Sequence, residues 1–201
     1  MSDVVKMVVV LTVICLLSAF ALTALRNGLE ARIVAQEEFY VLGPALHELL
    51  PDATNDPVAQ AFSAEVEGEA WRMYPWLENG KCRAVAVRST GKGGYGGDIQ
   101  LLTAFDLTTA KIMGVRVTAH QETPGVGSRA ADPSYLRVYA DRGYSAGTQI
   151  ALKQGGGEID AVSGATYTST AVADGVNRAV QFVLAHKDEI PDWALAKNSG
   201  T

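Results

Sequence analysis

The feature that most constrains this chain is an uninterrupted apolar run near its N-terminus. Met7 to Leu25 contains no charged residue, and Lys6 and Arg26 flank it. As a helix this run would be about 28 Å long, close to the hydrocarbon thickness of a bilayer. No polar stripe interrupts it, so the core helix of a soluble protein is a poor alternative. The run predicts a single transmembrane helix within an N-terminal membrane anchor, residues 1–28.

The fate and the orientation of this segment depend on its flanks. Ala19-Phe20-Ala21 resembles a signal-peptide cleavage site, which leaves a cleaved signal peptide as the alternative, but the apolar run continues beyond it. Lys6 on one side is almost balanced by Arg26 and Arg32 on the other, so the charge bias does not choose an orientation. A very short N-terminal tail before a long C-terminal region favours export of that region.

The remaining chain reads as one α+β domain behind the anchor. Residues 30–50 have apolar positions at helical spacing, with Gly43-Pro44 as a break, so residues 29–57 form a helical connection. The domain itself is expected over residues 58–201. A second convincing helix is expected over 171–186, where valines and alanines form one apolar face.

The centre of the domain has the pattern of an antiparallel sheet flanked by these helices. Short apolar runs separated by turn residues predict three strands and suggest two more. The three are expected at 82–87, 99–105 and 111–118, and the further two at about 136–139 and 148–152.

Charge and cysteine content exclude several classes of function. The net charge is −5 and no basic cluster is present, so nucleic-acid binding is not expected. The two cysteines, Cys15 and Cys82, cannot supply a disulfide framework, a zinc site or an iron–sulfur cluster.

A glycine-rich stretch resembles a nucleotide-binding loop only in its spacing. Gly91 to Gly96 matches G-x-G-x-x-G, but the residues after it, 98–102, predict a strand where a dinucleotide fold needs a helix. Lys92 is not followed by Ser or Thr, so a P-loop is excluded as well. The loop is interpreted as a tight strand connection, with a loop that approaches a flat ligand as the alternative.

The segment that indicates chemistry is Asp160 to Thr170, where small and hydroxyl residues lead into the C-terminal helix. A helix N-terminus offers unpaired N–H groups and a positive dipole end, which suit a phosphate. Gly164 and Ala165 let the backbone approach closely, and further hydroxyl donors come from Ser163, Thr166, Thr168 and Ser169. A plain helix cap selects the same residue types, so composition leaves both interpretations open.

Asp160 to Thr166 resembles the flavinylation motif Asp-x-x-Ser/Thr-Gly-Ala-Thr of the FMN-binding domain family. The resemblance implies that FMN is attached covalently, through a phosphoester, to Thr166. It also implies that a separate flavin transferase makes the bond and recognises Asp160. No histidine near Thr166 in the sequence is placed to activate its hydroxyl, which agrees with an external enzyme.

A second stretch, His120 to Gly127, is similar to the His-x-Glu-Thr-Pro-Gly-Leu/Val-Gly segment of related redox subunits. Pro124-Gly125 predicts a turn, after which Glu122 and Thr123 would face the ring or the ribityl chain of the flavin. An ordinary solvated loop is the alternative. The segment 93–97 is also similar to a loop in these proteins, whereas Tyr135 stands where they are expected to have tryptophan.

Together these stretches resemble the G subunit of Rnf-type ferredoxin:NAD oxidoreductases, and the compact length favours it over the related C subunit of sodium-pumping NADH:quinone reductases. The resemblance implies an electron-transfer subunit of an ion-translocating complex in the prokaryotic cytoplasmic (inner) membrane, with its domain on the periplasmic or extracellular side. The implied partners are the other subunits, including a membrane subunit with a second covalent FMN. A tethered, non-redox assembly module is the remaining alternative.

Overall fold

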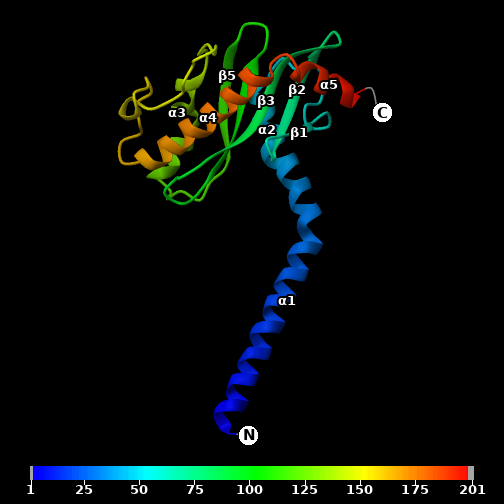
Figure 1. Ribbon diagram of the computed structural model, residues 1–201, viewed down its shortest axis with the longest axis vertical. Coiled ribbons are helices and arrows are strands. Elements are labelled where there is room, and N and C mark those ends of the chain that lie inside the picture. Colours follow the sequence, from blue (N-terminus) through cyan, green and yellow to red (C-terminus); the bar gives the residue numbers. More distant parts are fainter. Residues whose placement is uncertain (1, 199–201) are drawn as a thin grey trace. The chain divides into compact units, whose positions relative to one another are not determined.

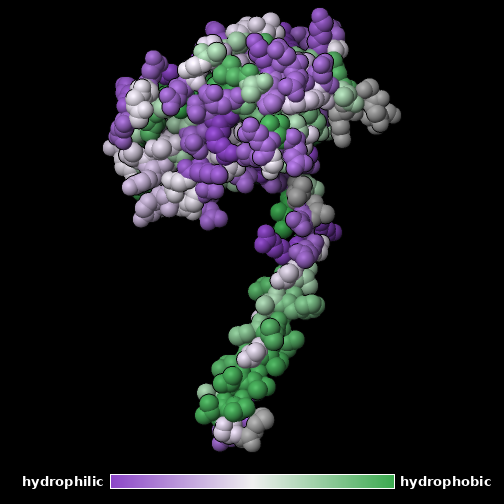
Figure 2. All heavy atoms as spheres, viewed as in Figure 1, coloured by the Kyte–Doolittle hydropathy of each residue, from purple (hydrophilic) through white to green (hydrophobic). Residues whose placement is uncertain are grey.

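The computed structural model describes residues 2–198 and divides the chain into two compact units, Met1–Val41 and Leu42–Thr201. The first unit is dominated by the helix α1 (Asp3–Glu37). Of the described helices, this one alone has the length and composition to cross a membrane, over Asp3–Glu30. Hydrophobic side chains cover its surface over most of this length in Figure 2, as a membrane span requires.

Two short elements follow the long helix. A π-helical turn, η1 (Glu38–Leu42), is followed by α2 (Gly43–Leu49), so the predicted break at Gly43-Pro44 coincides with the start of a new helix. The compact second unit begins at Leu42, within the range expected for the helical connection.

The second unit is built on a five-stranded antiparallel meander in the order β1-β2-β3-β4-β5 (Figure 1). The expected α+β class and the antiparallel sheet are therefore confirmed. The strands are β1 (Phe62–Val66), β2 (Glu69–Glu78), β3 (Lys81–Gly91), β4 (Ile99–Asp106) and β5 (Lys111–Ala119).

The first two strands lie outside the ranges expected from the sequence, although their turns carry a signal. Val66 pairs with Glu69 and Glu78 with Lys81, so two-residue turns join β1 to β2 and β2 to β3. Asn79 (φ 51°) and Gly80 (φ 73°) adopt the left-handed conformation that such tight hairpins require. Asn-Gly is the strongest short hairpin signal, and it predicts β2 and β3 as partners.

Alternation along the strands gives the sheet two buried faces. Val85, Val87, Leu101 and Phe105 lie in the larger core, on the face covered by α4 (Thr166–His186) and α5 (Ile190–Asn198). Cys82 belongs to the same face. The neighbouring positions form a second core with leucines of α2, and they are Ala84, Ala86, Leu102 and Ala104.

The predictions of strands at 136–139 and 148–152 are wrong. The region 136–139 is helical, because α3 (Pro133–Leu136) and a 3-10 turn, η3 (Arg137–Tyr139), bury Leu136 and Tyr139 three residues apart on one side. Residues 148–152 form no regular strand, and none of the described strands pairs with them. Leu152 makes one isolated bridge to Ile159, and the backbone N–H of Ile150 donates to the side chain of Asn177 on α4.

Two glycines, Gly91 on β3 and Gly175 on α4, let the helix pack closely against the strand. A Cβ atom on Gly91 would lie 1.8 Å from the carbonyl oxygen of Ala171, and one on Gly175 would lie 2.9 Å from the backbone nitrogen of Gly91. The hydroxyl of Ser89 donates to the carbonyl oxygen of Gly175 at 2.9 Å. Only glycine allows the helix and strand backbones to approach this closely.

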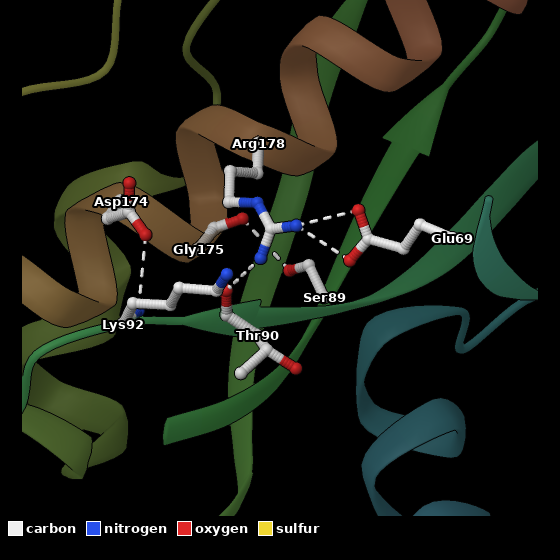
Figure 3. A network of polar contacts seen from close by, with 7 residues as sticks. All are labelled: Glu69, Ser89, Thr90, Lys92, Asp174, Gly175 and Arg178. Carbon is white, nitrogen blue, oxygen red and sulfur yellow. Dashed lines mark hydrogen bonds and ion pairs between the residues drawn. The ribbon is translucent and has the colours of Figure 1, made fainter. Parts of the chain in front are cut away.

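An arginine on the same part of α4 ties the helix to two strands (Figure 3). Arg178 donates to both carboxylate oxygens of Glu69, at 2.6 and 2.7 Å, and to the carbonyl oxygen of Thr90 at 2.7 Å. Its guanidinium also lies 5.8 Å from the ring centroid of Trp71. The middle of α4 is therefore held in position along and across the sheet.

Candidate functional site

The candidate site is built around the first turn of α4. The helix begins at Thr166, five residues before the expected start at Ala171, directly after the left-handed Gly164 (φ 78°) and Ala165. Its N-cap is Ala165, which has no side chain able to accept a hydrogen bond. The backbone N–H groups of Thr166, Tyr167 and Thr168 donate to no other described residue. These three amides are open donors at the positive end of a 21-residue helix.

The hydroxyls around this turn fall into two groups. Thr168 is buried and donates to a carboxylate oxygen of Glu122 at 2.6 Å. Ser169 is buried and accepts a hydrogen bond from the backbone N–H of Val162 at 3.0 Å. Thr166 and Ser163, in contrast, are exposed. The two buried hydroxyls thus stabilise the site by internal hydrogen bonds, and the two exposed hydroxyls are available to a ligand.

The second predicted motif lies against this turn. Glu122 is only 5% exposed, and its other carboxylate oxygen accepts from the backbone N–H of Gly96 at 2.9 Å. The expected turn at Pro124-Gly125 is present, with the backbone N–H of Gly125 donating to the hydroxyl of Ser128 at 2.9 Å. Residues 46 positions apart in the sequence are thus joined directly by the contact between Glu122 and Thr168.

A cavity of about 290 Å³ lies between these segments. Its walls include six of the predicted site residues and four more that lie in the same predicted segments but were not predicted individually. The predicted ones are Glu122, Thr123, Gly164, Ala165, Thr166 and Thr168, and the others are Tyr95, Val126, Gly127 and Tyr167. Ser163, Ser169, Pro124, Gly125 and Asp160 are adjacent in sequence to the wall or near it but do not line the cavity.

Exposed apolar side chains are concentrated at this cavity. In the described part of the second unit, the exposed large hydrophobic residues are Tyr95 (79%), Val126 (50%), Tyr167 (71%) and Leu195 (36%), and the first three line the cavity. Exposed apolar residues that gather at one hollow are typical of a ligand-binding site. Tyr95 comes from the glycine-rich loop, so that loop does approach the candidate ligand site.

Comparison with known proteins agrees with this geometry. The FMN-binding domain family matches residues 94–181, which contain every wall of the cavity. Similar proteins include the G subunit of the ion-translocating oxidoreductase complex of Vibrio vulnificus (strain YJ016), 30% identical over 87% of each chain. The corresponding protein of Photorhabdus laumondii is 33% identical over 81% of this chain and 82% of its own. That of Stutzerimonas stutzeri is 36% identical over 86% of this chain and 77% of its own.

This chain belongs to the family of G subunits of ion-translocating oxidoreductase complexes. The expected FMN-binding domain and the resemblance to the G subunit are therefore confirmed. The crystal structure of NqrC from Shewanella oneidensis is also similar, with a TM-score of 0.44 and 25% identity over 65% of this chain and 67% of that one.

The acidic start of the motif, Asp160, lies outside the cavity in this member of the G-subunit family. Asp160 is exposed, and its carboxylate pairs with the ammonium group of Lys153 at 2.8 Å. The hydroxyl of Tyr135 donates to the backbone carbonyl oxygen of Asp160 at 3.0 Å. Tyr135 thus fixes the backbone at the first residue of the motif, and the carboxylate of Asp160 remains accessible from solvent.

The site of this G-subunit family member fits FMN in two respects. An exposed hydroxyl and open helix amides lie together, as a phosphate requires. An apolar rim with two tyrosines suits a flat ring system, and no lysine or arginine lines the cavity. The described residues contain no group of three or more His, Cys, Asp or Glu that could hold a metal ion.

Proposed function

We propose that this chain carries FMN in a phosphoester to the hydroxyl of Thr166 and relays electrons within a membrane-bound, Rnf-type ferredoxin:NAD oxidoreductase. The observation that carries the proposal is the exposed hydroxyl of Thr166 beside three open amides on the edge of an apolar cavity. When bound, FMN supplies the redox chemistry, and the protein supplies attachment, orientation and electrostatics.

The residues of the first turn of α4 have distinct tasks in this proposal. A phosphodiester on Thr166 carries a negative charge, which the amides and the helix dipole stabilise without any basic side chain. Tyr95 and Tyr167 provide exposed aromatic faces for the ring. Thr123 and Ser163 supply further hydroxyls near the ring and the ribityl chain.

Attachment by a partner enzyme is part of this proposal, because among the described residues no base forms a hydrogen bond with the exposed hydroxyl of Thr166. A flavin transferase fits this role, and Asp160 is a suitable contact for it because the carboxylate is exposed at the entrance to the motif. The other proposed partners are the remaining subunits of the complex, including a membrane subunit with a second covalent FMN. The domain is proposed to lie on the periplasmic or extracellular side of the prokaryotic cytoplasmic membrane, where a covalent bond prevents loss of the cofactor.

The test is the intact mass of the full chain produced together with a flavin transferase, compared with Thr166→Ala. We expect a mass increase of FMN minus water and flavin fluorescence on a denaturing gel, both lost in Thr166→Ala. Thr170→Ala is the matched control, since Thr170 is an exposed threonine one turn later on the same helix and should keep the flavin. A wild-type protein without added mass, beside a transferase active on another substrate, would contradict the proposal and leave Thr166 as an ordinary helix residue.

A further inference from the structure

The carboxylate of Glu122 occupies a niche formed largely by glycine. A Cβ atom on Gly127 would lie 2.4 Å from one carboxylate oxygen, and a Cβ atom on Gly94 would lie 2.7 Å from the other. Gly96 donates its backbone N–H to the same carboxylate. At positions 94 and 127 only glycine leaves room for the carboxylate, which explains the composition of both loops.

The two hydrogen bonds of this carboxylate join separate parts of the site. One oxygen holds the backbone of Gly96, and the other holds the hydroxyl of Thr168 in the first turn of α4. Tyr95 directly precedes Gly96 and lines the cavity. Glu122 therefore fixes the position of the loop that carries Tyr95 relative to the helix that carries Thr166.

The charge of this carboxylate has no compensating cation. Glu122 forms no ion pair within the described part of the chain, and both of its hydrogen-bond donors are neutral groups. His120, the nearest titratable residue in sequence, is exposed and uses its Nδ1 atom to accept the backbone N–H of Glu122. A buried charge acts strongly on neighbouring groups because little water screens it.

From this geometry we propose two roles for Glu122. As a positioning residue, it holds the Gly93–Gly97 loop over the cavity by its hydrogen bonds, an arrangement called the latch below. Through its fixed negative charge, it lowers the reduction potential of the bound flavin. The inference rests on the proposed function, because it concerns FMN in this cavity. An electron delivered to FMN by an external reductant adds negative charge beside the carboxylate. Repulsion between the two charges makes that addition less favourable, so the potential falls.

The charge is tested with the flavinylated full chain by spectroelectrochemical titration of wild type and Glu122→Gln. Glutamine keeps the size of the side chain and an oxygen that can accept from Gly96, and it removes the charge. Its amide nitrogen can donate to the hydroxyl of Thr168, which reverses the direction of that hydrogen bond. We expect the equilibrium constant for one-electron reduction to rise about tenfold in the variant, a shift of about +59 mV. Glu158→Gln is the control, because Glu158 is an exposed acid paired with Arg142 outside the cavity, and its potential should match wild type.

The latch is tested separately by amide hydrogen exchange on the protein without flavin. Glu122→Ala removes the acceptor of the Gly96 N–H, so residues 93–97 should exchange faster while the strands β3 and β4 keep their protection. Equal exchange in the two proteins would overturn the latch.

The outcomes separate this inference from the proposed function. A wild type without covalent flavin contradicts the proposed function, and the electrostatic role fails with it. A flavinylated Glu122→Gln with the wild-type potential overturns the electrostatic role alone and leaves the attachment at Thr166 intact.

Discussion

The first turn of α4 and the middle of the same helix are built in opposite ways. At the middle, Gly91 and Gly175 bring the backbones together and Arg178 adds three hydrogen bonds to β2 and β3. At the first turn, the N-cap is Ala165 and the side chain of Thr166 is exposed. The close packing of the middle fixes the helix on the sheet, and buried side chains of Thr168 and Ser169 hold the first turn from inside. The start of the helix can therefore keep open backbone donors and still have a fixed position.

The largest expected effect comes from Gly91→Ala. Its Cβ would meet the backbone oxygen of Ala171 at 1.8 Å, and α4 would have to move away from the sheet. We expect a loss of about 3 kcal/mol in the free energy of unfolding, measured by urea denaturation of the full chain in detergent. Gly155→Ala is the matched control, since its Cβ meets no atom within 4 Å. Equal stability of the two variants would show that the middle of the helix is not closely packed.

Arg178→Gln should have the next largest effect. It removes the paired hydrogen bonds to Glu69 and the bond to the carbonyl oxygen of Thr90. Because Glu69 is half exposed, water partly replaces the lost contacts, and we expect a loss of about 2 kcal/mol in the same assay. Arg83→Gln, at the exposed pair with Glu78, should change stability far less. The comparison fails if both arginines prove equally important.

Ala165→Ser should change stability in the opposite direction. A serine hydroxyl at the N-cap can accept a hydrogen bond from the amides of the first turn, which we expect to stabilise the protein by about 0.5–1 kcal/mol. The same hydroxyl competes with a phosphate for these donors, so the fraction of flavinylated protein, measured by intact mass, should fall. Ala146→Ser, in an exposed loop, should change neither quantity. A more stable variant with full flavinylation would show that the phosphate does not use these amides.

Thr166→Ala should have the smallest effect on stability. The side chain is exposed and donates to no described residue, so the free energy of unfolding of the flavin-free protein should stay within about 0.5 kcal/mol of wild type. A thermal melt of both proteins checks this. A larger loss would mean that the hydroxyl has a structural role, and the contrast between the two parts of α4 would weaken.

Much of the fold could be predicted because it depends on local patterns. The apolar face of α4, the strands β3 to β5 and the apolar N-terminal run all repeat with the period of their own element. The strand β2 is harder to predict because it contains Pro75, which argues against a central strand. Proline is accepted there because Asn55, and not β1, completes the hydrogen bonding beside it, through the carbonyl oxygen of Pro75 and the N–H of Leu77.

The site could be predicted only as far as its motifs extend. Thr166 and Glu122 lie in stretches with a recognisable pattern, and the structure brings both to one cavity. Tyr95 and Tyr167 escape prediction because their exposure depends on how distant segments pack, although an aromatic residue inside a glycine-rich loop is a usable hint. The alternation of apolar residues at 148–152 predicts a strand, and only the fold shows that none of the described strands pairs with this segment.

The burial of Cys82 has a consequence for the durability of the domain under oxidising conditions. It is the one thiol of the second unit's described residues, and it lies in the larger core, on the face of the sheet covered by α4 and α5. Burial raises the pKa of its thiol to about 12. Oxidants and alkylating reagents attack the thiolate, which is almost absent at neutral pH under these conditions. The folded domain should therefore resist iodoacetamide and remain free of intermolecular disulfide crosslinks, so air exposure during purification should leave its thiol unmodified.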